Sequence, residues 1–314
     1  MARGGLVAPA RTPPAAGPAR APRRRGLGPS PWTALAYIAP AFVVYAVFLL
    51  YPLGRAVHLS LFDWDGLTLA TFVGFGNYVD VVADERLRAA FGHAFVLIVF
   101  FALLPTAIGL VLAAVLSRAK VRGLSFFRTV VFLPQVVAMV VVGVAWRRIY
   151  APDGSLNDVL AAIGLGGLAR AWLGDPVLAL PAVGIVGTWV QTGLATVLLM
   201  AGMSRIPGEL YEACRLDGAG AVREVFAITL PAVRSELAVA LTLTVIAALR
   251  TFDLIYITTG GGPGNRTSVP AFEVYNRAFR LGEVGSAAAI GVTLTVIIFV
   301  INLAVARIGE RGAR

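Results

Sequence analysis

Charged residues are scarce in this sequence of 314 residues: 14% are Asp, Glu, Lys or Arg, whereas 58% are hydrophobic and the mean hydropathy is +0.81. A soluble domain of this size needs far more polar side chains, because its surface faces water. The composition therefore predicts that lipid surrounds most of the chain. The net charge of +10 does not indicate nucleic-acid binding, because the Arg residues stand at the ends of apolar runs rather than among aromatic residues on one face.

Residues that often carry chemistry are also few. One cysteine, Cys214, excludes an internal disulfide, and with two histidines, His58 and His93, it argues against a structural zinc site. The single lysine, Lys120, has no glycine before it and no Ser or Thr after it, so it cannot belong to a phosphate-binding P-loop. We therefore expect no metal, no cofactor and no catalytic residue here, and any ATP must bind to another chain.

Long apolar runs are abundant, and a membrane-spanning helix needs about 20 such residues. Six stretches qualify: residues 33–53, 91–116, 126–149, 178–202, 237–259 and 285–306. Pro134 and Pro181 fall inside two of them, which neighbouring helices in a bundle can accommodate. The sequence thus predicts an all-α membrane protein with a six-helix bundle in residues 31–306. A disordered tail rich in Arg, Pro and Ala (1–30) precedes it and a short tail (307–314) follows it.

The basic residues indicate the orientation of these spans. If the N-terminus is cytoplasmic, the inner segments hold seventeen of the 27 Lys and Arg residues and the outer segments hold nine. Inner loops of membrane proteins carry the excess of positive charge. We therefore expect both termini in the cytoplasm, although the N-terminal tail supplies six of the seventeen.

The loop at residues 204–231, between the fourth and fifth expected spans, predicts two short helices. Gly218 suits the left-handed stop of the first helix, and Asp217 is placed to cap the second. One face of the second helix collects Val222, Val225, Phe226 and Thr229. The residues alone leave two interpretations open: the helix pair docks into a groove on another protein, or it lies on the membrane surface as an amphipathic connector.

The spacing of this loop resembles a known motif. Glu212-Ala213-Cys214 is followed after three residues by Gly218, and after nine more by Ile228-Thr229-Leu230-Pro231. This resembles the EAA loop of ABC importer permeases at every spacing, with Cys214 where a second alanine is usual. The resemblance implies that the loop docks into a cleft on an ATP-binding subunit, through Glu212, Ala213, Cys214, Asp217, Gly218, Ile228, Leu230 and Pro231.

Further segments within residues 32–306 are similar to the carbohydrate-importer permeases, the group of the maltose, glycerol-3-phosphate and multiple-sugar systems. They are Tyr51-Pro52, residues 72–78, residues 172–176 and residues 250–263. The resemblance implies an ABC type I importer permease fold in a bacterial cytoplasmic membrane. It also implies four kinds of partner: a second, homologous permease, two ATP-binding subunits, an extracytoplasmic solute-binding protein and the lipid bilayer.

The fourth expected span carries a polar stripe formed by Thr188, Gln191, Thr192 and Thr196, which share one helical face. A helix face that meets lipid tails finds no hydrogen-bond partners there for such a stripe. Two interpretations remain open: hydrogen bonding between helices, worth roughly 1 kcal/mol or less per contact, or a hydrophilic path for substrate.

Arg250 is the one Lys or Arg residue inside an expected span and away from its ends, and Asp253 follows it on the same helical face. An unpaired Arg at mid-membrane costs about 2.5–3.5 kcal/mol on insertion scales, so we expect the two side chains to pair. The pair could join helices as a structural bolt, or it could line a cavity on the substrate path. Tyr256, in the same segment, is a further candidate for that path.

These observations favour a transmembrane permease subunit that performs no chemistry and moves a sugar by alternating access. Glycerol-3-phosphate or another polar solute is the first alternative. An ion-coupled transporter or channel is more remote, because such proteins place several carboxylates or histidines within the membrane. An intramembrane hydrolase would need a nucleophile beside a base, and neither histidine has a suitable serine partner.

Overall fold

The computed structural model describes residues 31–118 and 123–310, which are mostly helical. Within these residues one short hairpin forms, in which β1 (Phe62–Asp63) pairs antiparallel with β2 (Thr71–Phe72). The expected tail at residues 1–30 and the last four residues of the expected C-terminal tail lie outside the described residues. The chain divides into two compact units, residues 1–52 and 53–314, and each is considered by itself.

The first unit is an apolar helix. It consists of α1 (Pro31–Tyr45) and a π-helical turn, η1 (Ala46–Leu50), and it continues into α2 (Tyr51–Leu59). Residues 35–59 are long and apolar enough to cross a membrane, and none of the most apolar window is buried inside the protein. A helix that is apolar on all sides is suited to lipid or to a partner helix.

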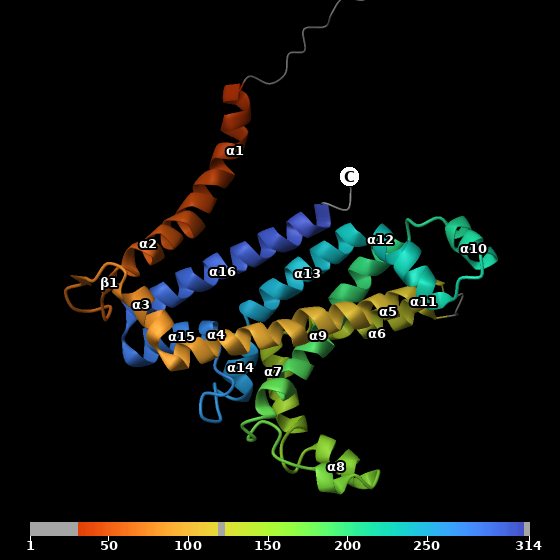
Figure 1. The fold of residues 1–314 in the computed structure, drawn as a ribbon. Coiled ribbons are helices and arrows are strands. Elements are labelled where there is room, and N and C mark those ends of the chain that lie inside the picture. The colour runs from red at the N-terminus through yellow and green to blue at the C-terminus, as the bar shows by residue number, and fades with distance from the viewer. Residues whose placement is uncertain (1–30, 119–122, 311–314) are drawn as a thin grey trace, which may run out of the picture. The chain divides into compact units, whose positions relative to one another are not determined.

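The second unit contains the remaining helices (Figure 1). Its first half comprises α3 (Gly76–Ala83), α4 (Glu85–Ile98), the π-helical turn η2 (Val99–Leu103), α5 (Leu104–Arg118), α6 (Leu124–Val136), α7 (Met139–Ile149), α8 (Ser155–Ala162) and the 3₁₀ turn η3 (Gly166–Leu168). Its second half comprises α9 (Ala179–Met203), α10 (Gly208–Leu216), α11 (Ala221–Glu224), the π-helical turn η4 (Val225–Thr229), α12 (Leu230–Ala232), α13 (Arg234–Leu249), α14 (Asp253–Thr258), α15 (Pro270–Tyr275), the π-helical turn η5 (Asn276–Leu281) and α16 (Val284–Glu310).

Four of the described helices are long and apolar enough to span a membrane by themselves, at residues 35–59, 85–117, 179–203 and 284–307. Two bent pairs bring the number to six if each pair counts as one span. They are α6 with α7, bent by 96°, and residues 221–232 with α13, bent by 79°.

Two expected spans are therefore not continuous helices. The stretch 126–149 breaks after α6, where Val137 has an extended backbone. The stretch 237–259 ends as a helix at Leu249, and residues 250–252 are irregular before α14 begins. Irregular backbone at membrane depth is tolerated where it is buried in protein or lines a cavity.

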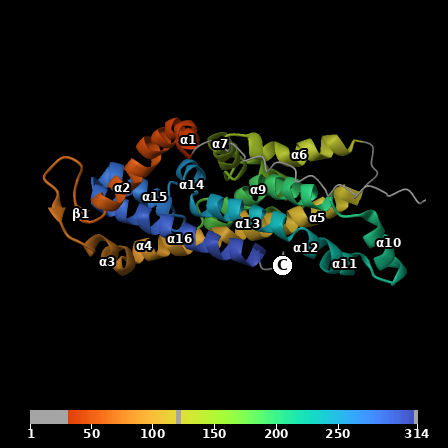
Figure 2. The ribbon, with the colours of Figure 1, turned by 90° about the horizontal axis from the view of Figure 1, so that it is seen from above.

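The second unit packs around α9, which lies beside α5, α6 and α13, and α13 lies in turn beside α16 (Figures 1 and 2). Glycines allow the closest of these approaches. A Cβ at Gly109 of α5 would lie 2.9 Å from the backbone nitrogen of Thr196, and a Cβ at Gly193 would lie 2.6 Å from the carbonyl oxygen of Val131 on α6. Small residues that let helix backbones meet are the usual basis of helix packing in membranes.

Three of the π-helical turns have a common local cause. η1, η2 and η4 each end two residues before a proline, at Pro52, Pro105 and Pro231 respectively. Proline lacks the N–H group and its ring crowds the carbonyl four residues earlier, so the preceding turn widens. The sequence thus sets where these helices depart from α geometry.

Candidate functional site

A cavity of about 390 Å³ lies where two of the helices break. It is bounded by the junction of α6 with α7, by α9, and by the end of α13 with the start of α14. The residues that line it are Phe101, Gln135, Met139, Gln191, Leu194, Leu243, Ile246, Ala247, Arg250, Thr251, Phe252, Asp253 and Leu254. The cavity thus combines an apolar wall with a few polar groups, which is typical of sites for small molecules.

Two amide side chains in this lining have buried oxygens with no partner. Gln191 is 4% exposed, and neither its Oε1 nor the buried Oε1 of Gln135 accepts a hydrogen bond from the described residues. Leaving a buried acceptor unsatisfied costs about 1–3 kcal/mol. Gln135 and Gln191 are therefore polar side chains of the lining whose buried oxygens the described residues leave unsatisfied.

Arg250 and Asp253 both line the cavity with exposed side chains. The prediction that they pair is wrong for the described part of the chain, in which they form no ion pair with each other. The helical spacing that would bring them together does not exist, because α13 ends at Leu249 and α14 begins at Asp253. Among the described residues the two side chains therefore do not join helices by pairing with each other, and both line the cavity.

The polar stripe of α9 divides between two roles. Gln191 faces the cavity, whereas the Thr188 hydroxyl donates to the carbonyl of Phe100 at 2.6 Å and so bonds two helices together. Thr192 and Thr196 donate to carbonyls one turn earlier on their own helix, each at 2.7 Å. None of the three threonines lines the cavity.

Tyr256 does not line the cavity either, but it is linked to it by aromatic contacts. Its ring stacks on Phe252, a lining residue, with 5.3 Å between the ring centroids. Tyr275 on α15 contacts both rings, also at 5.3 Å. Aromatic residues thus extend from the cavity wall to α15.

Sequence reasoning missed several lining residues, among them Gln135, Met139 and Phe252. Gln135 carried a signal that could have been used, since an amide inside an apolar run is unusual and it follows Pro134. Met139 and Phe252 carried none, because an apolar residue in an apolar run does not reveal which side of its helix faces a cavity.

The second candidate region is the elbow, which we define as α10 to α12, residues 208–232. It projects from one end of the second unit (Figures 1 and 2). Gly218 has a φ of 78°, as its predicted left-handed stop requires. Glu212 and Ala213 are exposed on α10, and Cys214 is half-buried. Ile228 and Leu230 are half-buried and Pro231 is exposed.

Asp217 does not cap the second helix of the elbow. It closes the end of α10, and the residue before α11 is Gly220, which has no side chain to cap with. The predicted shared face also changes, since Val222 and Phe226 are exposed whereas Thr229 is fully buried. The cause is η4, because a π-helical turn shifts the residues after it relative to an α-helix.

The elbow has two arms: the first is α10, and the second runs from α11 through η4 to α12. Two polar contacts join these arms. Arg215 Nε donates to Glu224 Oε1 at 2.7 Å, and the Tyr211 and Thr229 hydroxyls lie 3.0 Å apart. The hydrogen bond to Glu224 raises the pKa of Arg215 above its ordinary value, so the guanidinium stays charged. Sequence reasoning did not find this set, because it depends on how α10 folds back on η4.

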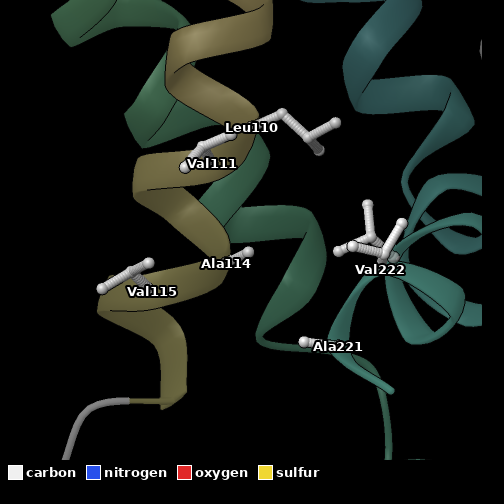
Figure 3. A pocket seen from close by; sticks show the side chains of 7 residues that line it. Leu110, Val111, Ala114, Val115, Ala221 and Val222 are labelled. Atoms are coloured by element: carbon white, nitrogen blue, oxygen red, sulfur yellow. The ribbon is translucent and has the colours of Figure 1, made fainter. Parts of the chain in front are cut away.

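The base of the elbow is held by an apolar cluster of α5, α9 and α13 that includes Ala113, Leu199, Met203 and Val233. Beyond this cluster the second arm stands away from α5. Between them lies an apolar hollow of about 310 Å³, into which Leu110 and Ala114 of α5 point toward Val222 (Figure 3). The second arm is therefore anchored at its base and is separated from α5 by this hollow.

No group of three His, Cys, Asp or Glu side chains within residues 31–118 and 123–310 could hold a metal ion.

The sequence profile of a protein family described as "Binding-protein-dependent transport system inner membrane component" matches residues 106–312. Among similar proteins, "Probable ABC transporter permease protein YurN" of Bacillus subtilis is 39% identical over 270 residues, which is 85% of this chain and 92% of that protein. "Diacetylchitobiose uptake system permease protein NgcF" of Streptomyces coelicolor is 37% identical over 278 residues, 85% of this chain and 79% of that protein.

A solved structure shares the fold. It is described as "Crystal structure of bacterial alginate ABC transporter in complex with alginate pentasaccharide-bound periplasmic protein". The TM-score is 0.73 at 22% sequence identity, and the match covers 89% of this chain and 94% of that one.

Proposed function

The chain belongs to the family of binding-protein-dependent transport system inner membrane components, and we propose that it forms one half of the path of a neutral sugar through an ATP-driven importer. It is a membrane protein and a permease subunit of an importer. The sugar, the partners and the direction of the spans are the parts that we propose.

The chemistry of the cavity supports a sugar. Sugar hydroxyls can bond to the amide groups of Gln135 and Gln191 once these side chains turn toward the cavity, and to Thr251, while the ring of Phe252 suits the apolar face of a pyranose. The two buried amide acceptors carry this proposal. The name of NgcF, which describes that protein as taking up diacetylchitobiose, agrees with it.

An anionic solute such as glycerol-3-phosphate is the second candidate. Arg250 favours it, because this guanidinium lines the cavity and forms no ion pair with Asp253 in the described structure. Asp253 lines the same cavity, however, and its carboxylate repels an anion. The neutral sugar therefore fits better.

We propose that the elbow couples this path to ATP hydrolysis. Its exposed motif residues Glu212 and Ala213, with Gly218 at the turn, would dock into an ATP-binding subunit on the cytoplasmic side. The positive charge of the inner segments supports cytoplasmic termini. A second permease, two ATP-binding subunits and an extracytoplasmic binding protein would complete the importer, which works by alternating access.

The test replaces one amide acceptor in the assembled importer. Gln191→Leu keeps the size of the side chain and removes the hydrogen-bonding group, so uptake of a radiolabelled disaccharide into proteoliposomes should fall about tenfold. Asn302→Leu on α16 is the matched control, because Asn302 also has a buried, unpartnered amide oxygen but does not line the cavity.

Equal uptake by the Gln191→Leu variant and the wild type would refute the proposed path. Uptake of radiolabelled glycerol-3-phosphate by the wild type, with no uptake of the disaccharide, would favour the anionic solute instead.

A further inference from the structure

The two arms of the elbow meet through one face each. On α10, Tyr211 and Arg215 are four residues apart and so lie on the same side of the helix. On the second arm, Glu224 and Thr229 are five residues apart. A π-helical turn bonds residues five apart, so η4 brings these two side chains onto one side as well.

The geometry of η4 is required for this match. In a regular α-helix the residue in line with Glu224 would be Ile228, whose side chain cannot bond to the Tyr211 hydroxyl. With the π turn, Thr229 takes this place, is fully buried and lies 3.0 Å from the Tyr211 oxygen. Its hydroxyl is also 3.4 Å from the Glu224 carbonyl, to which it donates.

Glu224 is a buried charge in an otherwise exposed element. It is 2% exposed, whereas its neighbour Val222 is 72% exposed. A buried carboxylate needs a charged or hydrogen-bonding partner, and the short bond from Arg215 Nε supplies one across the elbow. The position of Glu224 thus depends on contact with α10.

Two features of the described residues leave the angle between the arms adjustable. The connection between them contains Gly218 in a left-handed conformation, and the hollow toward α5 leaves the second arm without close packing on that side. Polar contacts are directional, so they can fix an orientation that a loosely packed apolar face cannot.

We propose that Arg215 with Glu224, and Tyr211 with Thr229, form a brace that makes the elbow a single rigid lever and sets how much solute is imported per ATP hydrolysed. The inference rests on the proposed docking of the elbow. These four are positioning residues, since they act through the motif residues that meet the ATP-binding subunit. With the brace intact, movement of α10 is transmitted to α12 and α13. With the brace broken, α10 moves with the ATP-binding subunit, but the second arm and α13 move less.

The test uses the assembled importer in proteoliposomes and measures import and ATP hydrolysis together. Arg215→Gln is compared with Arg223→Gln, because Arg223 is exposed on the second arm and forms no hydrogen bond or ion pair with the described residues. We expect Arg215→Gln to retain the ATP-binding subunits and their hydrolysis, while solute imported per ATP falls roughly two- to tenfold. The Arg223→Gln ratio should equal that of the wild type.

Tyr211→Phe and Thr229→Val provide a milder test that preserves the shape of the elbow. Each removes the hydrogen bond between Tyr211 and Thr229, so the double variant should lower the ratio by less than the sum of the two single variants. An unchanged ratio in Arg215→Gln and in the double variant, with the ATP-binding subunits still bound, would overturn the brace. If the wild-type chain itself fails to retain ATP-binding subunits, the proposed docking fails, whatever these variants do.

Discussion

A buried carboxylate, Glu273, links two helices at the end of the second unit that lies away from the elbow. Its side chain is 1% exposed and accepts hydrogen bonds from Arg86 Nε at 3.0 Å and from Ser268 Oγ at 2.5 Å. Arg86 lies on α4 and Glu273 on α15, so the ion pair joins segments that are distant in the sequence. Such a pair becomes costly when its cation is removed, because the carboxylate is then left buried without compensation.

Arg86→Met should therefore destabilise the protein by about 3 kcal/mol, which a thermal melt of the detergent-solubilised chain would detect as a lower apparent melting temperature. Arg88→Met is the matched control on the same helix, because Arg88 is exposed and donates to two carbonyl oxygens of the preceding turn. Equal melting temperatures for the two variants would contradict the importance of the buried pair.

Substitutions of Arg250 and Asp253 test whether the two side chains interact in the assembled importer. Because they form no ion pair within the described structure, the coupling between Arg250→Gln and Asp253→Asn should come only from the cavity that they share and stay at about 0.5–1 kcal/mol. The measurement is a double-mutant cycle on the apparent affinity for the transported solute. A coupling energy well above this value would show that the two side chains pair in the assembled importer.

At the scale of single helices, small residues allow close packing, as where α6 approaches α9. A Cβ at Gly193 would meet the carbonyl oxygen of Val131 and the Cα of Phe132, which are backbone atoms of α6 that cannot rotate away. By contrast, a Cβ at Gly92 of α4 would meet nothing within 4 Å. The two glycines thus differ in their surroundings although both lie inside helices.

Gly193→Ala should accordingly force α6 away from α9 and lower stability by about 1–3 kcal/mol. Gly92→Ala should instead stabilise the protein by about 0.5–1 kcal/mol, because alanine favours the helical backbone. Melting temperatures of the two variants, measured side by side, should move in opposite directions. A melting temperature for Gly193→Ala that matches the wild type would mean that the α6–α9 contact is not as close as the structure has it.

At the scale of the whole molecule, the cavity and the elbow share two helices. α9 contributes Gln191 to the cavity and ends just before the elbow, while α13 begins directly after the elbow and ends beside Arg250. A displacement of the elbow therefore reaches the cavity through two continuous helices. This arrangement supports the proposed coupling, in which a cytoplasmic partner opens and closes the path without binding near it.

Glu212→Lys should abolish uptake and release the ATP-binding subunits, because it reverses the charge of the exposed motif residue on α10. Glu209→Lys is the control, since Glu209 is exposed on the same helix outside the motif. Co-purification of the ATP-binding subunits reports docking, and uptake reports transport. If the Glu212→Lys variant still binds the ATP-binding subunits and still imports solute, coupling through the elbow is refuted.

The sequence by itself determined the class of the protein and the position of the motif that we propose to couple it to ATP hydrolysis. Apolar runs of about 20 residues predict membrane helices whatever their neighbours, because the thickness of the bilayer sets their length. Gly218 was likewise predictable, since a left-handed turn requires glycine for local steric reasons. The prolines after η1, η2 and η4 also act locally, because each affects only the turn before it.

Only the tertiary structure decided which side chains meet. It ended one predicted span at Leu249 and thereby separated Arg250 from Asp253, and it divided the polar stripe of α9 between a cavity and helix contacts. It also brought Arg215 to Glu224 across the elbow. These outcomes depend on residues far apart in the sequence. In a membrane, the partner of a polar side chain is supplied by a neighbouring helix. The periodicity along one helix does not identify that neighbour.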